Sequence, residues 1–220
     1  MEQKLAAKNK HPCFILVRPQ MGENIGAAAR AMWNFGLERM RVVSPRDGWP
    51  NQKAVAMASG AGRLLDEALI FPTFEEAIAD QNFVFATTAR PRDLIKPIYS
   101  PKDAIRLAVS KMSEGQNVGF IFGPERSGLE NSDIVKANAI ISVPVNDHFP
   151  SLNLAQCVLV LAYEWMLNLN NSDIDSSTFD QSNVVSNMQV EKLCNYFEEN
   201  LEEVGFFYPE DKAESMKTNF

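Results

Sequence analysis

The stretch Val118-Gly-Phe-Ile-Phe-Gly-Pro-Glu-Arg-Ser-Gly-Leu-Glu130 changes character in its middle. Its first five residues are apolar and rich in β-branched and aromatic side chains, which predicts a short buried strand. The turn signal Gly123-Pro124 follows at once, with the charges of Glu125 and Arg126 directly behind it. In open α/β sheets, ligands bind beyond the carboxyl ends of the strands. The stretch therefore predicts a strand that leads into a ligand-binding loop, although an ordinary strand exit would have a similar composition.

The rest of the chain alternates short apolar runs with helical patterns. This alternation predicts an α/β domain with a mostly parallel sheet of six or seven strands, flanked by helices. The expected strands cover residues 14–17, 40–43, 69–71, 83–87, 118–122 and 139–145. The expected helices cover residues 25–35, 53–60, 73–79, 101–112, 131–137 and 151–168.

Charge is distributed unevenly along the chain. Of the net charge of −7, residues 1–165 carry +1 and residues 166–220 carry −8. A stretch rich in Asn, Ser and Asp is typical of a linker, and an acidic amphipathic helix is expected after it, from 188 to 205. Because negative charge repels phosphate, this helix is expected to pack on protein rather than on RNA. The predicted divisions are a main domain at 1–168, the linker at 169–186 and a helical extension at 187–220, with a continuation beyond residue 220 left open.

Composition argues against several classes of protein. No apolar run reaches the roughly 18 residues of a membrane-spanning helix, and the polar residues 1–10 do not form a secretory signal. A cytoplasmic protein without a membrane partner is therefore expected. Cys13, Cys157 and Cys194 lie far apart in apolar or amphipathic stretches and are interpreted as reduced core thiols. The two histidines are also distant from each other, so no metal site is expected.

Three polar loops flank the expected strands. They are Gly22-Glu-Asn-Ile-Gly-Ala-Ala-Ala-Arg30, Gly123-Pro-Glu-Arg-Ser-Gly-Leu129 and Pro150-Ser-Leu-Asn-Leu-Ala155. Each has a simpler interpretation, because Asn24 or Ser151 can cap a helix and Arg30 can be a surface charge. Together and in this order, they resemble the three signature motifs of the SpoU branch of the SPOUT RNA methyltransferases. Those motifs read Asn-x-Gly-x-x-x-Arg, Gly-x-Glu-x-x-Gly-Leu and Ser-Leu-Asn-x-Ala, and the resemblance covers residues 12–168.

The resemblance implies a specific fold and activity. SpoU-type enzymes have an α/β fold with a C-terminal trefoil knot, bind S-adenosyl-L-methionine in a bent shape, form homodimers and methylate ribose 2′-hydroxyls of RNA. The loop Thr87-Thr-Ala-Arg90 and the acidic C-terminal helix look most like the tRNA enzymes that modify nucleotide 32 of the anticodon loop. Because of this similarity, tRNA is the favoured partner. The C-terminal extension of this chain is shorter than that of those enzymes usually is.

Other functions remain as alternatives. Within the same family, the substrate could instead be ribosomal RNA. A catalytically silent RNA-binding paralogue is a further alternative, against which the three intact motifs count. A dinucleotide-binding dehydrogenase is discounted, because the first expected strand is followed by Gly22-Glu-Asn-Ile-Gly26 rather than by Gly-x-Gly-x-x-Gly.

The resemblance also implies roles for individual residues. The expected catalytic set is Asn24, Arg30, Glu125, Ser151 and Asn153. The expected S-adenosylmethionine site is Thr87, Thr88, Ala89, Gly123, Glu125, Ile141, Val143, Pro144, Pro150, Ser151, Leu152 and Asn153. Candidate contacts to RNA phosphates are Arg18, Arg30, Arg90, Arg92 and Arg126.

Arg30 stands alone among alanine and apolar residues on its expected helix. If that helix packs on the core, the guanidinium needs a partner from elsewhere, such as a substrate phosphate or a hydroxyl that loses its proton. Arg30 could then act as a general base, or it could hold the adjacent phosphate and stabilise the developing alkoxide. The third possibility is that Arg30 simply points to solvent.

Overall fold

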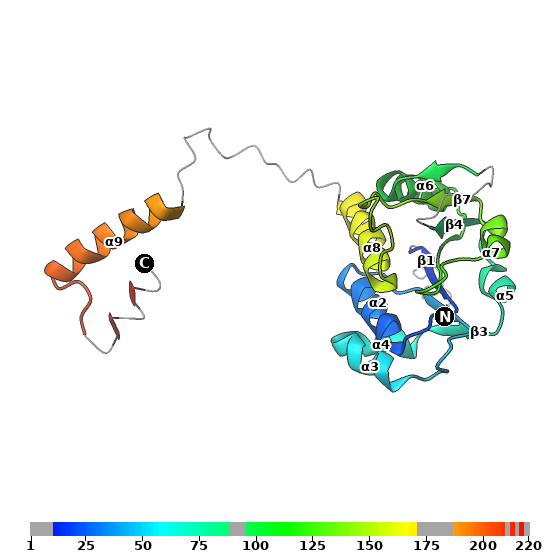
Figure 1. Cartoon of the computed structure of the whole chain (residues 1–220), viewed down its shortest axis with the longest axis horizontal. Helices are drawn as coiled ribbons and strands as arrows, with labels where there is room; N and C mark the ends of the chain where they lie inside the picture. The colour runs from blue at the N-terminus through cyan, green and yellow to red at the C-terminus, as the bar shows by residue number, and fades with distance from the viewer. Residues whose placement is uncertain (1–10, 89–95, 171–186, 210–211, 214–215, 218–220) are drawn as a thin grey trace. The chain divides into compact units, whose positions relative to one another are not determined.

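The computed structural model describes residues 11–88, 96–170, 187–209, 212–213 and 216–217. The chain divides into two compact units, Met1–Ser172 and Asp173–Phe220. The first unit contains a sheet with helices on both of its faces (Figure 1).

The sheet has seven strands in the order β3-β2-β1-β6-β4-β7-β5, and all neighbouring strands are parallel. The strands are β1 (Cys13–Val17), β2 (Met40–Val43), β3 (Leu69–Phe71), β4 (Phe83–Thr87), β5 (Ile98–Tyr99), β6 (Val118–Phe122) and β7 (Ala139–Ile141). This confirms the predicted α/β class and the mostly parallel sheet. The trefoil knot that the resemblance implies stays a prediction.

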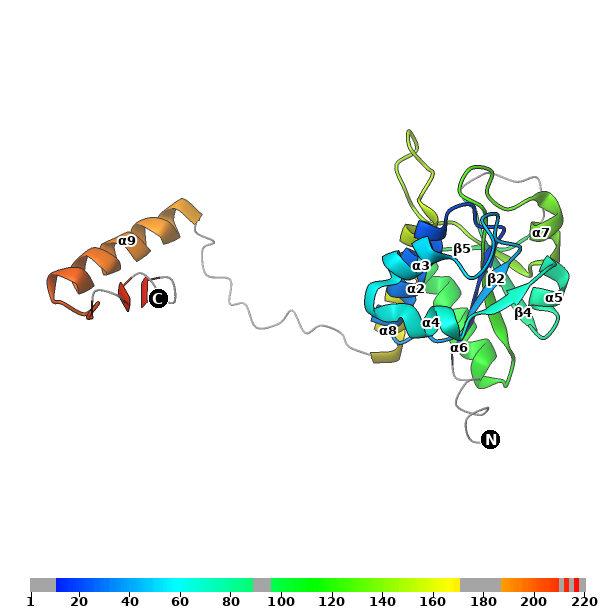
Figure 2. The same ribbon diagram turned by 90° about the horizontal axis from the view of Figure 1, so that it is seen from below.

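The helices cover both faces because successive strand residues point to opposite sides of a sheet. They are α2 (Gly22–Asn34), α3 (Gln52–Ala58), α4 (Gly62–Asp66), α5 (Phe74–Ile78), α6 (Pro101–Ser113), α7 (Asn131–Lys136) and α8 (Leu154–Asn170). On β1, Phe14 and Leu16 pack in one buried cluster with side chains of α2, α3, α4, α6 and α8. Ile15 and Val17 pack in a second cluster with side chains of α5 and α7. Figures 1 and 2 show α2 and α8 on one side of the sheet and α5 and α7 on the other.

Several element boundaries differ from the prediction. The strand expected at 139–145 ends at Ile141, because Pro144 has no N–H with which to extend a ladder. The helix expected at 53–60 corresponds to α3 and the 3-10 turn Ser59–Ala61, and α4, which follows them, was not predicted. Strand β5 was not predicted, because its two residues carry little pattern and its order comes from pairing with β7. By contrast, the predicted Thr73 cap is confirmed, since its hydroxyl accepts the backbone N–H of Glu76 at 3.3 Å.

A buried arginine ties the second strand to the segment after α5. Arg41 is 6% exposed and donates two hydrogen bonds of 2.6 Å to the carboxylate of Asp80. A third bond of 2.6 Å reaches the carbonyl of Ala77. The hydrogen bonds from Arg41 lower the pKa of Asp80 to about 2. Arg41 therefore has its charge compensated inside the fold.

The second unit contains α9 (Asn187–Glu203), close to the predicted helix at 188–205. Cys194 is exposed on this helix, so the expectation that all three cysteines lie in a core is wrong for this one. Residues 171–186 of the predicted linker lie outside the described residues, and residues 169 and 170 belong to α8. Within the described part of the chain, no helix combines the length and the apolar character that crossing a membrane requires.

Candidate active site

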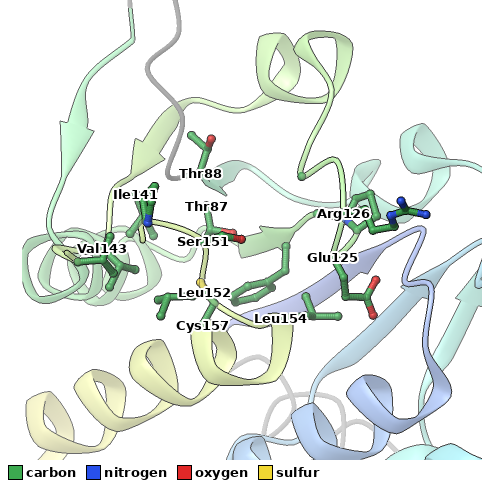
Figure 3. A pocket seen from close by; sticks show the side chains of 16 residues that line it. Thr87, Thr88, Glu125, Arg126, Ile141, Val143, Ser151, Leu152, Leu154 and Cys157 are labelled. Atoms are coloured by element: carbon green, nitrogen blue, oxygen red, sulfur yellow. The ribbon is translucent and has the colours of Figure 1, made fainter. Parts of the chain in front are cut away.

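A cavity lies at the carboxyl ends of β4, β6 and β7 (Figure 3). The parallel sheet brings four segments together there, each of which follows a strand or begins α8. The lining residues are Thr87, Thr88, Phe122, Gly123, Pro124, Glu125, Arg126, Gly128, Ile141, Val143, Val145, Pro150, Ser151, Leu152, Leu154 and Cys157. The cavity is thus at the edge of the sheet where the sequence predicts a ligand.

Most of the residues expected to hold the cofactor line this cavity. They are Thr87, Thr88, Gly123, Glu125, Ile141, Val143, Pro150, Ser151 and Leu152. Pro144 and Asn153 are not among the lining residues. Ala89, Arg90 and Arg92 lie outside the described residues.

Sequence reasoning missed five lining residues, namely Phe122, Gly128, Val145, Leu154 and Cys157, whereas Pro124 belongs to the loop 123–125 that was expected at the cofactor. Two of them carry a signal that was available. Leu154 and Cys157 follow Asn153 by one and four residues at the start of α8. Because residues three and four apart share a helix face, that spacing places Cys157 beside Leu154.

Glu125 is engaged in three hydrogen bonds at the start of α2. Its Oε2 accepts the backbone N–H of Gln20 at 2.7 Å. Its Oε1 accepts the backbone N–H of Met21 at 3.2 Å and the side-chain amide of Asn24 at 2.8 Å. A carboxylate at this position also interacts favourably with the positive end of the helix. Glu125 therefore fixes the entrance to α2.

This contact explains why α2 begins at Gly22, three residues before the predicted start at Ile25. The N-cap residue Met21 makes no side-chain capping bond. The polar contacts at this end come instead from Glu125, which is 101 residues from Asn24 in the sequence. Asn24 is consequently a buried residue of the first helical turn, and the alternative that it caps the helix is wrong.

Asn24 continues the contact to the third loop. Its Oδ1 accepts a hydrogen bond of 2.9 Å from Nδ2 of Asn153. The Oδ1 of Asn153 accepts the backbone N–H of Ala155 at 2.8 Å and so caps α8. For this reason α8 begins at Leu154 rather than at Ser151, and the alternative that Ser151 caps it is wrong. A continuous line of side chains, Asn153–Asn24–Glu125, joins the three loops; we call it the amide relay.

Gly123 lies where its loop folds back on itself. A Cβ atom at this position would lie 2.3 Å from the backbone nitrogen of Leu129 and 2.5 Å from the carbonyl carbon of Gly128. Real Cβ atoms do not approach backbone atoms so closely, so only glycine fits without moving the loop. The turn is closed by a hydrogen bond of 2.8 Å from the Gly128 N–H to the carbonyl of Pro124.

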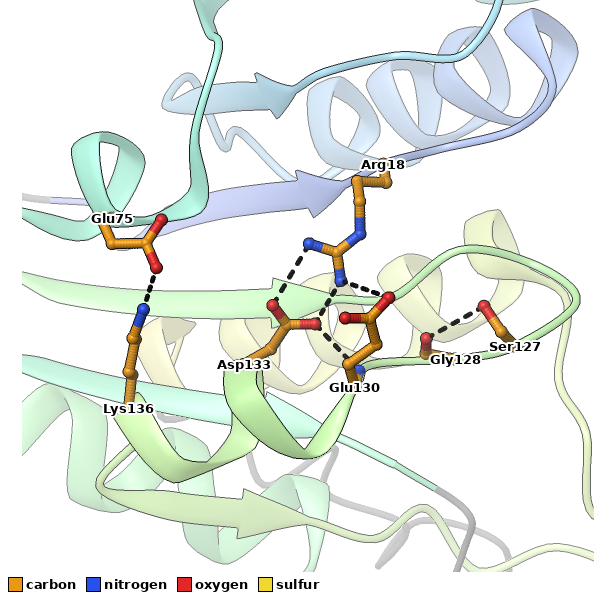
Figure 4. A network of polar contacts seen from close by, with 7 residues as sticks. All are labelled: Arg18, Glu75, Ser127, Gly128, Glu130, Asp133 and Lys136. Carbon is orange, nitrogen blue, oxygen red and sulfur yellow. Dashed lines mark hydrogen bonds and ion pairs between the residues drawn. The ribbon is translucent and has the colours of Figure 1, made fainter.

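The guanidinium of Arg18 is held by carboxylates at the start of α7 (Figure 4). It donates to both carboxylate oxygens of Asp133, with a distance of 3.3 Å to Oδ1, and lies 3.7 Å from Glu130. Asp133 is buried, and its Oδ2 also accepts the backbone N–H of Glu130 at 2.9 Å. Arg18 was expected to contact RNA phosphate. The structure instead gives it partners within the fold, where it anchors the segment that Glu125 holds at Gln20 and Met21.

The other two described arginines of the candidate set are exposed. Arg126 lines the cavity (Figure 3), and Arg30 lies on the surface of α2. Neither forms a hydrogen bond or an ion pair with another described residue. Helix α2 turns Ile25, Ala28 and Met32 toward the core and leaves Arg30 exposed, which agrees with the alternative that its side chain points to solvent.

Cys157 and Thr87 meet inside the cavity. Burial raises the pKa of the Cys157 thiol to about 11, although a hydrogen bond with Thr87 acts in the opposite direction. The Thr87 hydroxyl donates a bond of 2.9 Å to the carbonyl of Ile121. The thiol is therefore protonated at neutral pH, and Cys157 contributes a weakly polar wall rather than a nucleophile.

Known proteins match this chain over most of its length. The model of the SpoU rRNA Methylase family matches residues 12–163. The tRNA (cytidine-2′-O-)-methyltransferase TrmJ of Methanocaldococcus jannaschii is 33% identical over 210 residues, which are 94% of this chain and 87% of that protein.

Solved structures agree with these sequence matches. TrmJ from Z. mobilis ZM4 is 44% identical and has a TM-score of 0.67, with 94% of this chain and 87% of that chain covered. The SpoU methyltransferase AviRb from Streptomyces viridochromogenes, solved in complex with the cofactor AdoMet, is 18% identical, with a TM-score of 0.58 and coverage of 74% of this chain and 59% of that chain. At that identity, AviRb shows the shared fold alone.

Proposed function

This chain belongs to the SpoU methylase family, and from this premise we propose that it transfers a methyl group from S-adenosylmethionine to a ribose 2′-hydroxyl of tRNA, at nucleotide 32 of the anticodon loop. The observation that carries the proposal is the amide relay, which holds three distant loops at the edge of one cavity. The tRNA methyltransferase TrmJ of M. jannaschii, which is similar over 94% of this chain, supports tRNA as the substrate class. A tRNA-modifying role also agrees with the expected cytoplasmic location.

The cavity fits a nucleoside-like cofactor. Its lining combines apolar side chains such as Ile141 and Leu152 with the hydroxyls of Thr87, Thr88 and Ser151. Pockets for such ligands are mostly apolar with a few placed polar groups. Gly123 contributes only backbone atoms to the cavity wall, and a flat ring can lie close to such a wall. When bound, S-adenosylmethionine supplies an electrophilic methyl group on a sulfonium centre.

The residues of this chain would orient the acceptor ribose and hold the phosphate backbone of the RNA. Glu125 is engaged in three hydrogen bonds, so we assign it to fixing the loops rather than to proton transfer. Arg126 at the cavity and Arg30 on α2 are exposed cations, and guanidinium groups form paired hydrogen bonds with phosphate. We assign Arg30 to the phosphate beside the reacting ribose, where its charge also stabilises the oxyanion that forms as the hydroxyl loses its proton.

We further propose that the enzyme works as a homodimer. Trp33 of α2 and Leu159, Tyr163 and Leu169 of α8 are large apolar side chains with exposed fractions of 37%, 42%, 47% and 51%. Helices α2 and α8, which carry these residues, pack against each other. Exposed apolar patches mark protein interfaces. Sedimentation equilibrium of the full chain should give a dimer at micromolar concentration, and a monomer there would contradict this assignment.

The function is tested by mapping methylated riboses. Purified full-length protein is incubated with S-adenosylmethionine and unmodified tRNA transcripts, and nucleotides are analysed by mass spectrometry and primer extension. We expect one 2′-O-methyl group at nucleotide 32, and none with an Asn24→Ala variant that still folds. If the protein methylates ribosomal RNA and leaves tRNA unmethylated, the result would support the ribosomal alternative. RNA binding without methyl transfer to either RNA would contradict the enzymatic assignment.

A further inference from the structure

The loop between β7 and α8, residues 142–153, carries an aromatic side chain in the solvent. Phe149 is 76% exposed, the largest value among the large apolar side chains of the described residues in the first unit. It belongs to neither buried cluster. Figure 2 shows this loop, in yellow-green, standing away from the helices and the sheet. The exposed phenyl ring gains little stabilisation from burial in this fold, so its face is available to a binding partner.

The backbone of the loop fixes where Phe149 is presented. The side chain of Asn146 accepts the backbone N–H of His148 at 2.9 Å. The N–H of Phe149 donates to the carbonyl of Asn146, also at 2.9 Å. These bonds form a closed turn at 146–149. The chain then passes directly into Pro150, Ser151 and Leu152, which line the cavity.

The charges at the cavity and in the loop favour an RNA base as the partner of Phe149. Arg126 is an exposed cation on the wall of the same cavity, without a partner among the described residues. Asp147 is exposed in the same loop, two residues from Phe149, and its negative charge makes the turn itself a poor contact for phosphate. A flat aromatic ring is suited to stacking, and proteins bind unpaired RNA by stacking its bases on such rings.

We propose that Phe149 is a specificity-determining residue that stacks on an unpaired base at or next to the nucleotide whose ribose is methylated. This inference rests on the proposed function and adds the means by which a single-stranded loop is held over the cavity. Stacking is tolerant of base identity, because every base has a π face. Phe149 therefore selects for an unstacked nucleotide rather than for one particular base.

Kinetics of the full-length enzyme test this role. Phe149→Ala should raise the KM for tRNA about 5- to 150-fold, from the usual strength of base–aromatic stacking, while the affinity for S-adenosylmethionine measured by calorimetry stays unchanged. Phe149→Tyr should restore most of the KM, whereas Phe149→Leu, which is apolar but not flat, should not. Leu69→Ala is the matched control, since Leu69 is also exposed, at 54%, but lies on the edge strand β3.

A spectroscopic readout detects the stack directly. An anticodon stem-loop with 2-aminopurine at the target position or at its neighbours is bound to each variant. Stacking on an aromatic ring quenches this fluorophore, so wild-type protein and Phe149→Tyr should give dimmer complexes than Phe149→Ala. An unchanged KM together with unchanged emission for Phe149→Ala overturns the proposal.

Two other outcomes would assign Phe149 elsewhere. A dimer that becomes a monomer on Phe149→Ala would assign the ring to contact with a second copy of the chain. Loss of S-adenosylmethionine affinity would assign it to the cofactor pocket. Failure of the proposed function is separable from these, because it would appear as wild-type protein that methylates no tRNA even though its stem-loop binding depends on Phe149.

Discussion

The side-chain amide of Asn153 donates a hydrogen bond of 2.9 Å to the side-chain oxygen of Asn24, 129 residues earlier in the chain. The side-chain amide of Asn24 in turn donates a hydrogen bond of 2.8 Å to Glu125. Asn153 also caps α8, so one side chain sets the start of a helix and the position of a loop on another helix. Substitutions at Asn153 can separate the capping of α8 from the contact with Asn24.

Asn153→Asp keeps the cap and removes the relay. A carboxylate still accepts the Ala155 N–H, but it cannot donate to the oxygen of Asn24. We expect the thermal midpoint to stay within a few degrees, while single-turnover methylation slows by about 10- to 100-fold, since such supporting contacts orient a site. Asn153→Ala, which loses both the cap and the contact with Asn24, should also lower the thermal midpoint. Equal rates for wild type and Asn153→Asp would show that the relay does not serve the reaction.

Gly123→Ala tests the fold-back at the cavity wall. The added methyl group would meet the Leu129 nitrogen at 2.3 Å, so the loop must move. We expect cofactor affinity to fall at least about 10-fold and the free energy of unfolding to fall by about 1–3 kcal/mol. Gly60→Ala is the control, because a Cβ there has no atom within 4 Å. Isothermal calorimetry and urea unfolding measure the two effects, and an unchanged affinity would remove Gly123 from the binding site.

Arg30→Ala tests the cation on α2. Because Arg30 is exposed and has no partner among the described residues, its removal should leave the fold and the cofactor affinity unchanged. A lost charge contact in a transition state typically costs about 10²–10³ in rate, and we expect that loss at saturating tRNA. Arg30→Lys should restore little of it, since lysine lacks the planar fork. Arg106→Ala, an exposed arginine on α6, is the control; a near-normal rate for Arg30→Ala would exclude Arg30 from the chemistry.

The Arg41–Asp80 pair predicts a pH dependence of stability. The pKa of Asp80 is lowered to about 2 from 3.8, mainly by the hydrogen bonds from Arg41. The stabilisation is therefore present above pH 3.8 and is lost as the pH falls toward 2. Asp80 is half-exposed, so we expect a contribution of only about 1 kcal/mol. Chemical unfolding of Asp80→Asn should show this deficit at pH 7 and little difference from wild type at pH 2; Asp147→Asn is the control, and a deficit that does not change with pH would contradict the prediction.

A shortened chain tests the division into two units. The first unit ends at Ser172 and contains the whole sheet and the cavity. We expect a chain of residues 1–172 to fold and to bind S-adenosylmethionine with the affinity of the full chain. Circular dichroism and calorimetry measure both properties. A product that folds but has lost the cofactor would place part of the site in the acidic unit.

Local patterns predicted the elements that are long or strongly apolar. Strands such as Val118–Phe122 are read from composition, because a buried parallel strand is apolar along its whole length. The two residues of β5 carry no such pattern, and only their pairing with β7 orders them. The start of α2 was also missed, because its polar contact comes from Glu125 in a distant loop.

The candidate site was also predicted only in part from the sequence. The motifs placed most of the cavity residues, because loops after parallel strands must gather at one edge. They did not reveal which polar groups are already engaged. In the sequence, Arg18 and Glu125 both resemble unpaired charges. In the structure, Arg18 is hydrogen-bonded to Asp133, and Glu125 is hydrogen-bonded to the start of α2. Such pairings over more than 100 residues depend on the completed fold.

The position of β1 has a consequence for biosynthesis. This strand pairs on one side with β2 and on the other with β6, whose Gly119 lies opposite Cys13. At about 5–20 residues per second, a ribosome needs about 5–20 s to make the chain between these two partners. Throughout that interval one edge of an entirely apolar strand lacks its neighbour, which is a template for aggregation. Nascent chains arrested before residue 118 should therefore depend on chaperones more strongly than the full-length chain does.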